Sequence, residues 1–434
     1  MVKRNILVGI GNSKKKNPYE AAKEAVAEAL QTCPKPTFSI VYTNSDLDQN
    51  GFLKGLNEIL GTNWVGCSAD KMFNSKAGYD PELSISVLCM QSEYMHFSVE
   101  VAEKYRDNPQ KRGFESIKKA MKNIKGNEYL DSYIQFTRTK KEKYEDIVRT
   151  PPYFILTFIR GLTINKEGKT ISGNESEFLS GILEYTGPNI PMFGGSASSS
   201  LEEYEKGRAT NYQFANGKLY LEAAVVIFVV TDIYFATIVN HGYVLTSDYA
   251  AVTKLDKNGY EILSLNGKDP ISEYCRILGV DKKDYLRDSY KNSFSRPFGL
   301  VLEDGNSVVR EAVPNPDKKS LHSNFRLHKN ILLNVLSFDK KKTLETMRRS
   351  MENLTTLESD KKPEIAFFCN CSGRRPLVKD LEKKDVENLK KKFPTLNFFG
   401  FYSFGEVGST KTMAALLHSQ TVTALTIFND LLTK

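Results

Sequence analysis

The sequence has no apolar run long enough to cross a membrane and no clear export signal. A membrane-spanning helix needs roughly 18 consecutive apolar residues, and the apolar stretch Leu221–Val230 is about half as long. The start, Met1–Ile10, is charged, but its apolar stretch is too short for the core of a signal peptide. We therefore expect a cytoplasmic protein without a membrane partner.

Cysteine is scarce as well, with six in 434 residues. Several stand inside apolar segments, such as Cys89 and Cys369, and none belongs to a CxxC pair. This usage is typical of reduced thiols rather than of a disulfide framework, and it lacks the spacing of structural zinc sites. No metal site and no cofactor are expected.

Nucleic-acid motifs are absent too, although the formal net charge is +8. The lysines occur in short clusters on expected helices with glutamates among them, as at Lys390–Lys392, and the single tryptophan does not interleave with a basic stripe. A solvated lysine-rich surface explains this charge. We expect no nucleic-acid partner.

What the sequence does contain is a recurring order of elements: helix, strand, helix, strand with a glycine loop, strand. The first helices are expected at Glu20–Leu30, Gly113–Ile124 and Thr343–Leu357, the strands after them at Phe38–Tyr42, Phe154–Ile159 and Ile365–Cys369, and the final strands at Leu83–Met90, Leu221–Val230 and Thr421–Phe428. The pattern predicts an α/β protein of mixed sheets flanked by helices and built from duplicated units.

The glycine segments of these units are Asn63–Ser68, Ile190–Ser196 and Asn397–Gly408. Each is expected to be a buried strand that runs into a glycine-rich loop. Gly194–Ser200 has the composition of the most flexible of these loops, and glycines let a backbone approach a ligand closely. A plain surface loop is the alternative for this stretch.

Between the second and third units, Ile233–Phe338 has short strands and strong turn signals such as Lys257-Asn258-Gly259. It is expected to be an inserted antiparallel module. Upstream, Glu100–Pro151 is expected to be lysine-rich helix and connection. A chain of this length suits two or three domains, and we expect two, residues 1–230 and 231–434.

Several of these segments resemble motifs of the FIST family of sensory proteins, over residues 5–430. The segments that carry the resemblance are Val65–Ser68, Phe193–Ala197, Leu263–Gly267 with Pro270 and Tyr274, Cys371–Arg374, Phe404–Gly408 and Leu417–Thr421. In that reading residues 1–230 are the FIST N-terminal module and residues 231–434 the FIST C-terminal module. One departure is Ser199, where the family tends to place an acidic residue, and this departure bears on which ligand is bound.

The resemblance implies a stand-alone intracellular sensor of a small molecule such as an amino acid, without enzymatic activity. Because the resemblance uses the whole chain, an output domain is not expected within it. Signalling is then expected to pass to a separate partner protein such as a kinase, a cyclase or a chemoreceptor.

The residue types suit such a ligand. Arg374, or its neighbour Arg375, offers a planar fork for a carboxylate, Glu406 a countercharge for an ammonium group, and His418 a donor to either. An ordinary structural role is the alternative for each. The remaining residues expected to line the pocket are Gly66, Cys67, Gly194, Gly195, Ser196, Cys371, Tyr402 and Gly405.

Other functions stay open at this point. The first is a haem-bound gas sensor, known within the family, with His418 as axial ligand. The second is an enzyme with Cys371 as nucleophile, His418 as base and Glu406 as orienting group. The third is a recruitment module like the F-box relatives of the family, a poorer match because the chain begins directly in the first module.

Overall fold

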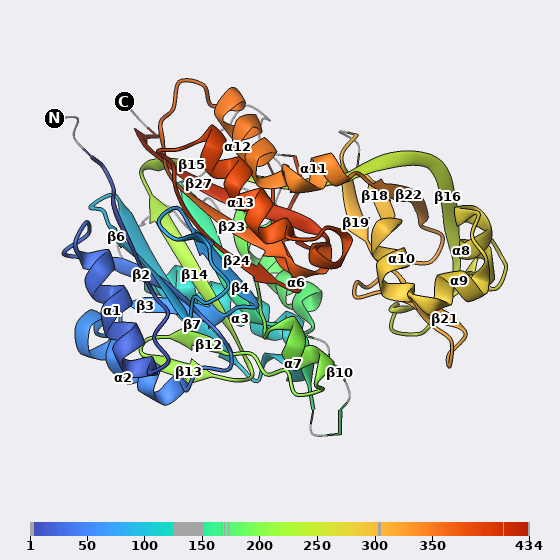
Figure 1. Cartoon of the computed structure of the whole chain (residues 1–434), viewed down its shortest axis with the longest axis horizontal. Helices are drawn as coiled ribbons and strands as arrows, with labels where there is room; N and C mark the ends of the chain where they lie inside the picture. Colours follow the sequence, from blue (N-terminus) through green and yellow to red (C-terminus); the bar gives the residue numbers. More distant parts are fainter. Residues whose placement is uncertain are drawn as a thin grey trace.

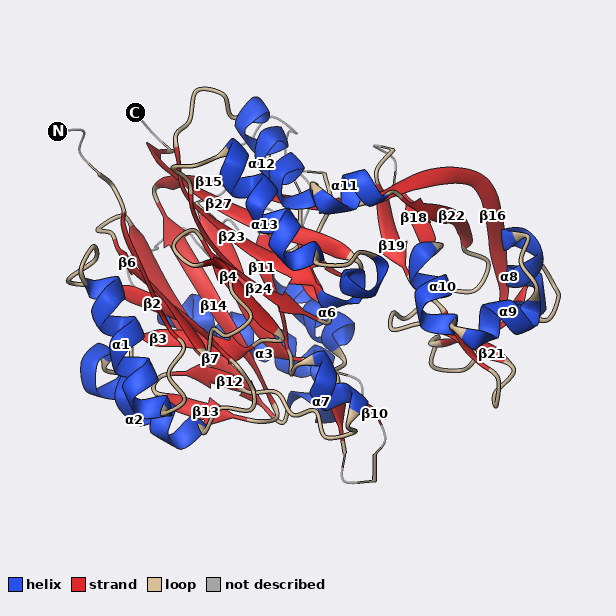
Figure 2. Ribbon diagram, viewed as in Figure 1, coloured by secondary structure: helices blue, strands red, loops and turns tan. Residues whose placement is uncertain are grey.

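The computed structural model describes residues 4–432 except 125–151, 166, 169, 172, 303, 304 and 411. It consists of a large body and a smaller module set to one side of it (Figure 1). Strands fill the middle of the body and helices lie on its outside (Figure 2). The α/β class expected from the sequence is confirmed. Most of the expected lysine-rich connection before Pro151 lies outside the described residues.

The first unit of the body alternates strands with two helices. The side chain of Asn17 accepts the backbone N–H of Glu20 and so caps the first helix, and Asp48 caps the second in the same way. The elements are β1 (Leu7–Ser13), α1 (Pro18–Leu30), β2 (Phe38–Thr43), α2 (Gln49–Leu60), β3 (Trp64–Ser68), β4 (Lys71–Asn74), β5 (Gly78–Tyr79) and β6 (Ile85–Gln91).

The second unit repeats this order. Asn108 caps its first helix, and Pro109 follows at the first helical position. The elements are β7 (Met95–Glu103), η1 (Tyr105–Asp107), α3 (Pro109–Asn123), β8 (Tyr153–Arg160), β9 (Thr163–Ile164), β10 (Thr170–Ile171), α6 (Glu175–Thr186), β11 (Met192–Ala197), α7 (Leu201–Glu205), β12 (Gln213–Ala215), β13 (Lys218–Tyr220) and β14 (Ala223–Thr231).

The third unit is interrupted after its first strand. The helix expected over Thr343–Leu357 is two helices, because the backbone leaves helical geometry at Glu345 (φ −119°, ψ 12°). The elements are β15 (Ile233–His241), α11 (Lys340–Leu344), α12 (Thr346–Leu357), β23 (Pro363–Cys371), the 3₁₀ helix η2 (Ser372–Leu377), α13 (Leu381–Lys392), β24 (Asn397–Ser403), β25 (Glu406–Gly408), β26 (Leu416–His418) and β27 (Thr421–Leu431).

The interruption is the antiparallel module that the sequence predicts. It begins at Tyr243 rather than at Ile233, because β15 pairs with β27 of the body. Its sheet curls around its own apolar core. The elements are β16 (Tyr243–Leu255), β17 (Glu261–Leu265), α8 (Pro270–Leu278), α9 (Lys282–Arg287), α10 (Ser289–Ser295), β18 (Phe298–Val301), β19 (Ser307–Arg310), β20 (Val313–Asn315), β21 (Ser320–His322) and β22 (Leu332–Phe338).

The units exchange hairpins in a cycle. Each of the three six-stranded sheets holds four strands of one unit. Their order is the first strand, the last strand, the middle strand and the strand with the glycine segment, and a two-stranded hairpin of another unit completes the sheet. Hairpin β4–β5 of the first unit pairs with β24 of the third, β25–β26 of the third with β11 of the second, and β12–β13 of the second with β3 of the first. Each sheet is therefore incomplete without another unit.

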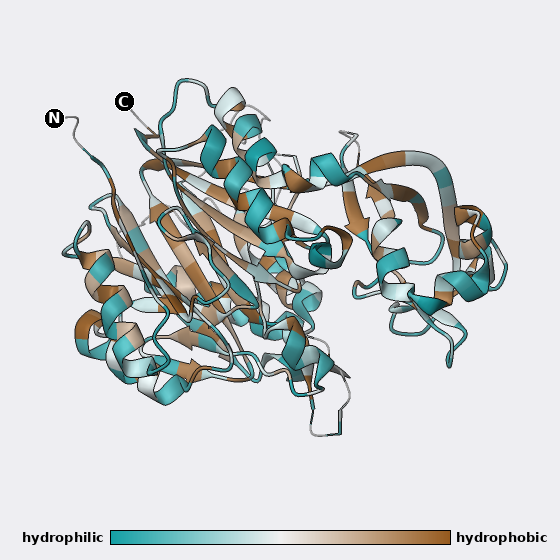
Figure 3. Ribbon diagram, viewed as in Figure 1, coloured by the Kyte–Doolittle hydropathy of each residue, from teal (hydrophilic) through white to brown (hydrophobic). Residues whose placement is uncertain are grey.

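The inner faces of the body sheets share one apolar core. Tyr42, Phe158 and Phe401 come from different sheets, and their ring centroids lie 4.5 to 6.2 Å apart. The helices cover the outer faces, with polar residues outward (Figure 3). Burying one such ring stabilises the fold by about 1.5–3 kcal/mol. Among the described helices, none is long and apolar enough to cross a membrane.

The glycines of the first two glycine segments, Gly66, Gly194 and Gly195, lie inside strands rather than in loops. A Cβ on Gly66 would clash with the carbonyl group of Val41 on the parallel neighbour β2, and one on Gly194 with that of Thr157 on β8. The expectation of a flexible loop over Gly194–Ser200 was wrong. Gly194–Ala197 belong to buried β11, Ser198 and Ser199 are buried after it, and Ser200 caps α7. The division expected after residue 230 falls inside β14, one residue before its end at Thr231, and strand pairing crosses it; as a domain boundary it stays a prediction.

Candidate functional site

Hairpin exchange brings part of the expected pocket together. Gly195 pairs with Glu406 between β11 and β25, and the backbone N–H of Ser196 donates to the carbonyl group of Gly405 at 2.8 Å. Gly66, Cys67 and Tyr402 lie on β3 and β24 and are buried. All of these positions belong to the interior of the body.

Glu406 is fully buried. Its carboxyl group accepts hydrogen bonds from the hydroxyl group of Thr421 at 3.0 Å and that of Ser403 at 3.4 Å. Burial raises the pKa of Glu406 to about 8, against hydrogen bonds from Thr421 and Cys371 that lower it. In this arrangement the group is largely neutral at pH 7, so it offers little charge to an ammonium ligand.

His418 is the register partner of Glu406 across β25 and β26. Its Nε2 lies 3.2 Å from the carbonyl oxygen of Gly408 rather than against Glu406 or Cys371, and Nδ1 has no hydrogen-bond partner among the described residues. Burial, together with the charge of Arg310, lowers the pKa of His418 to about 3. The ring is therefore neutral and internal.

Cys371 ends β23 and is buried. Burial raises the pKa of its thiol well above the usual range, and the nearby Glu406 and Glu311 add to the effect. The thiolate is the reactive form of cysteine. The surroundings of Cys371 therefore oppose the activation that a nucleophile needs.

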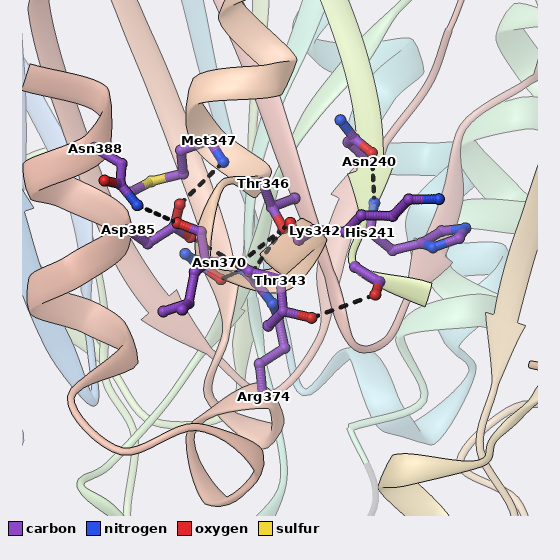
Figure 4. A network of polar contacts seen from close by, with 12 residues as sticks. Asn240, His241, Lys342, Thr343, Thr346, Met347, Asn370, Arg374, Asp385 and Asn388 are labelled. Atoms are coloured by element: carbon purple, nitrogen blue, oxygen red, sulfur yellow. Dashed lines mark hydrogen bonds and ion pairs between the residues drawn. The ribbon is translucent and has the colours of Figure 1, made fainter. Parts of the chain in front are cut away.

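Arg374 is 1% exposed, and its guanidinium group is engaged by the protein (Figure 4). Nη1 donates to Asn370 Oδ1, and Nη2 donates to the carbonyl oxygen of Thr343 at 2.6 Å and to Thr346 Oγ1 at 2.9 Å. Asp385 Oδ2 lies 3.4 Å from Nη2. The fork of Arg374 thus organises the interior and does not face a ligand.

Asp385 has a second task in this network. Its Oδ1 accepts the backbone N–H of Met347 at 3.1 Å, which caps the start of α12 where Glu345 makes no side-chain cap. Burial raises the pKa of Asp385 to about 6, although the charge of Arg374 lowers it. The ion pair therefore also holds a helix end.

The neighbouring Arg375 faces a cleft instead. Its Nη1 lies 2.5 Å from Asp70 Oδ2, and its Nε forms an ion pair with Glu382. Burial by itself would lower the pKa of Arg375, but the charges of Asp70 and Glu382 outweigh it and the pKa is raised. Neither contact uses Nη2, and Arg375, whose side chain is 19% exposed, lines the cleft.

Asp70 ties the three units together beneath this cleft. It follows β3 of the first unit and is 2% exposed. Its carboxylate accepts the backbone N–H of Leu201 of the second unit at 3.2 Å and the hydroxyl group of Ser372 of the third unit at 2.7 Å. Arg375 is thereby fixed at a point where all units meet.

The cleft has a volume of about 930 Å³. It is lined by Lys14, Tyr79, Asp80, Pro81, Glu82, Leu201, Arg375, Pro376, Val378, Lys379, Asp380, Glu382 and Lys383. A second hollow of about 660 Å³ shares Lys14 and Asp80 with it. The walls carry both charges and one aromatic ring, which suits a small ligand with a positive and a negative pole.

Sequence reasoning considered Arg375 only as the alternative to Arg374, and it missed Asp70, Glu382 and Tyr79. A usable signal existed. Arg375 and Asp70 both follow the carboxyl ends of parallel strands, where α/β proteins bind ligands. That signal does not reveal which of two adjacent arginines turns outward.

Comparisons with known proteins agree with the order of motifs. A family model described as the FIST N domain matches residues 37–268, and one described as the FIST C domain matches residues 270–409. An uncharacterized protein of Methanocaldococcus jannaschii, MJ1623, is 25% identical over 222 residues, which cover 48% of this chain and 40% of that protein. The chain thus spans less than half the length of this relative.

Solved structures give weaker likenesses. A cyanuric acid hydrolase aligns over 98% of this chain and 99% of its own, at 8% identity and a TM-score of 0.35. The cyanuric acid hydrolase of A. caulinodans aligns with the same coverage of both chains, at 7% identity and a TM-score of 0.35. PurLQS of Thermotoga maritima aligns over 97% of this chain and 72% of its own, at 10% identity and a TM-score of 0.20. Likenesses of this strength carry no argument about activity.

Proposed function

The chain belongs to the FIST family, whose domains are associated with sensory signal transduction, and we propose that it is a sensor of a small zwitterion such as an amino acid. The ligand binds in the cleft beside Arg375, not among the buried Arg374, Glu406 and His418. The sensor is not an enzyme and signals through a separate partner protein, such as a kinase, a cyclase or a chemoreceptor.

The observation that carries this proposal is that Arg375, held by Asp70 and Glu382 through Nη1 and Nε, lines a cleft of mixed charge. Nη2 of Arg375 donates a hydrogen bond to the carboxylate of the ligand, and the positive charge of Lys379 or Lys383 on the wall of the cleft also attracts this carboxylate. An ammonium group faces Asp80, Glu82 or Glu382. The volume of the cleft lies in the range of small-molecule sites, about 300–1,000 Å³.

Two findings support a sensor rather than a catalyst built on the expected triad. Burial raises the pKa of the Cys371 thiol, and the hydrogen bond of His418 goes to Gly408. At the cleft, in contrast, the charged side chains of Asp70 and Arg375 are held by contacts with all three units of the body. A ligand that binds there can alter how the units meet.

A panel of the common amino acids, added one at a time in a thermal-shift assay, tests the proposal, followed by calorimetry on any that raises the melting temperature. Arg375→Gln removes one charge-assisted contact, so the affinity should fall about ten- to a hundredfold. Lys379→Gln should weaken binding less, because this lysine stands on the wall.

Arg287→Gln is the matched control, since Arg287 is an exposed arginine of the module, away from the cleft. It should bind as the unchanged protein does. Full affinity in both Arg375→Gln and Lys379→Gln contradicts the site. A panel without any response contradicts the ligand class.

A further inference from the structure

We propose that the short helix η2 couples the cleft to the inserted module, so that a change at Arg375 alters how the module is held. The inference rests on the proposed function only in taking the cleft as the ligand site. Its physical basis is that η2 has the cleft on one side and the attachment of the module on the other.

Adjacent residues of η2 serve these two sides. Arg375 binds Asp70 and Glu382 at the floor of the cleft. Arg374 is buried and donates to the carbonyl oxygen of Thr343 at 2.6 Å. Because both side chains extend from the same short helix, a displacement of Arg375 also displaces Arg374.

Thr343 is the contact point of the module's attachment. The module leaves the body after Gly242 and returns at Asp339, and the backbone N–H of Asp339 donates to the carbonyl oxygen of Gly242 at 3.0 Å. Thr343 Oγ1 donates to the same oxygen at 3.4 Å, and a Cβ on Gly242 would clash with Thr343. Figure 4 shows Thr343 between Arg374 and the segment around His241.

A second contact runs directly from η2 to the module. Leu377 packs against Tyr243, Val309 and Leu336, which belong to the module's strands. The hydroxyl group of Tyr243 donates to the carbonyl oxygen of Phe294 in α10 at 2.7 Å. The helix η2 therefore touches both the attachment and the first strand of the module.

The coupling depends on which carboxylates bind the guanidinium group of Arg375: those of the protein alone, or that of the ligand as well. In the structure Arg375 is held by Asp70 and Glu382. A ligand carboxylate bound at Nη2 shares the positive charge of this guanidinium group with Asp70 and Glu382. It thereby weakens the hold of Asp70 on η2 and, through Arg374 and Leu377, the contacts of η2 with Thr343 and Tyr243. A ligand shifts such an equilibrium by its difference in affinity for the two states.

Hydrogen–deuterium exchange on the full chain tests the coupling without any ligand. Arg375→Gln breaks the pairing at the cleft. We expect exchange to rise at least about threefold in peptides covering residues 238–246 and 336–346, which contain the amides of the attachment. Lys391→Gln makes the same charge change at an exposed lysine of α13 that does not line the cleft, and it should leave these peptides unchanged.

Glu382→Gln provides a second variant, since it weakens the ion pair of Arg375 without leaving Asp70 alone. Glu382→Gln should also raise exchange in the attachment peptides, but by less than Arg375→Gln. If Arg375→Gln does not fold, the result with Glu382→Gln tests the coupling. Faster exchange around residues 70 and 375 with unchanged exchange at the attachment overturns the coupling. Failure of every amino acid in the thermal-shift assay counts against the proposed ligand instead, so the two failures can be told apart.

Discussion

At the scale of single residues, the interior of the third unit holds Glu406 and His418 in their neutral forms. Glu406 and His418 are both buried, and burial moves their pKa values in opposite directions, to about 8 and about 3. Neutral groups cost less to bury than charged ones. Glu406 and His418 thus contribute to the structure without carrying a charge.

The raised pKa of Glu406 predicts a specific dependence of stability on pH. Between the ordinary value near 4.5 and about 8, the unfolded chain has lost this proton while the folded chain keeps it. Stability is therefore fully present below pH 4.5 and falls as pH rises, by at most about 1.4 kcal/mol per pH unit. Glutamine does not titrate, so Glu406→Gln does not lose stability in this way. Relative to the unchanged protein, its free energy of unfolding should therefore increase from pH 5 to pH 8.

Urea unfolding at both pH values measures this difference. Glu387→Gln, at an exposed glutamate of α13, is the control and should follow the unchanged protein. A constant difference between Glu406→Gln and the unchanged protein across this range contradicts the burial of a neutral carboxyl group.

At the scale of elements, the structure uses buried ion pairs to hold the ends of helices. Arg374 and Asp385 join η2 to α13, and Asp385 also caps α12. Removing one member of a buried pair leaves the other charge unpaired, which costs more than the pair itself contributes. This makes the start of α12 depend on a residue from another helix.

Asp385→Ala should therefore lower the free energy of unfolding by about 3–5 kcal/mol. Asp385→Asn should cost less, because its amide oxygen still accepts the N–H of Met347. Chemical denaturation measures both, with the exposed Glu387→Ala on the same helix as control, expected within about 0.5 kcal/mol of the unchanged protein. Equal stabilities of Asp385→Ala and Glu387→Ala would show that the pair does not stabilise the helix end.

At the scale of the whole molecule, the exchange of hairpins makes the units of the body interdependent, whereas the module is an insertion. Every six-stranded sheet of the body takes a hairpin from another unit. The module, in contrast, has its own core and joins the body where Tyr243 and Phe338 pair as neighbours on antiparallel strands.

Replacing residues 245–336 by Asn-Gly should therefore leave a folded body. Val244 and Ser337 pair directly, so a two-residue turn can join them. We expect a cooperative thermal transition followed by circular dichroism. A chain that ends after residue 231 should show no such transition, because β11 then lacks β25 and the shared core loses one sheet. Cooperative unfolding of that chain contradicts the interdependence of the units.

The sequence by itself determined the repeated units, most helices and strands, the presence of an insertion and the family. The units, the elements and the insertion follow from the spacing of apolar residues, caps and turns, which act over a few neighbouring residues. The family follows from the resemblance of the motifs. The strands predicted at Phe38–Tyr42 and Ile365–Cys369 are confirmed, because the pattern that predicts them is local.

Only the tertiary structure decided which polar residues stay accessible. Arg374 and Arg375 are neighbours of the same chemical type, yet one is buried against Thr343 and the other faces the cleft. Their exposure depends on which distant segments cover each side of η2. Likewise, Gly194 serves strand packing because β8 lies beside it. Such contacts join residues far apart in the chain, so no local pattern records them.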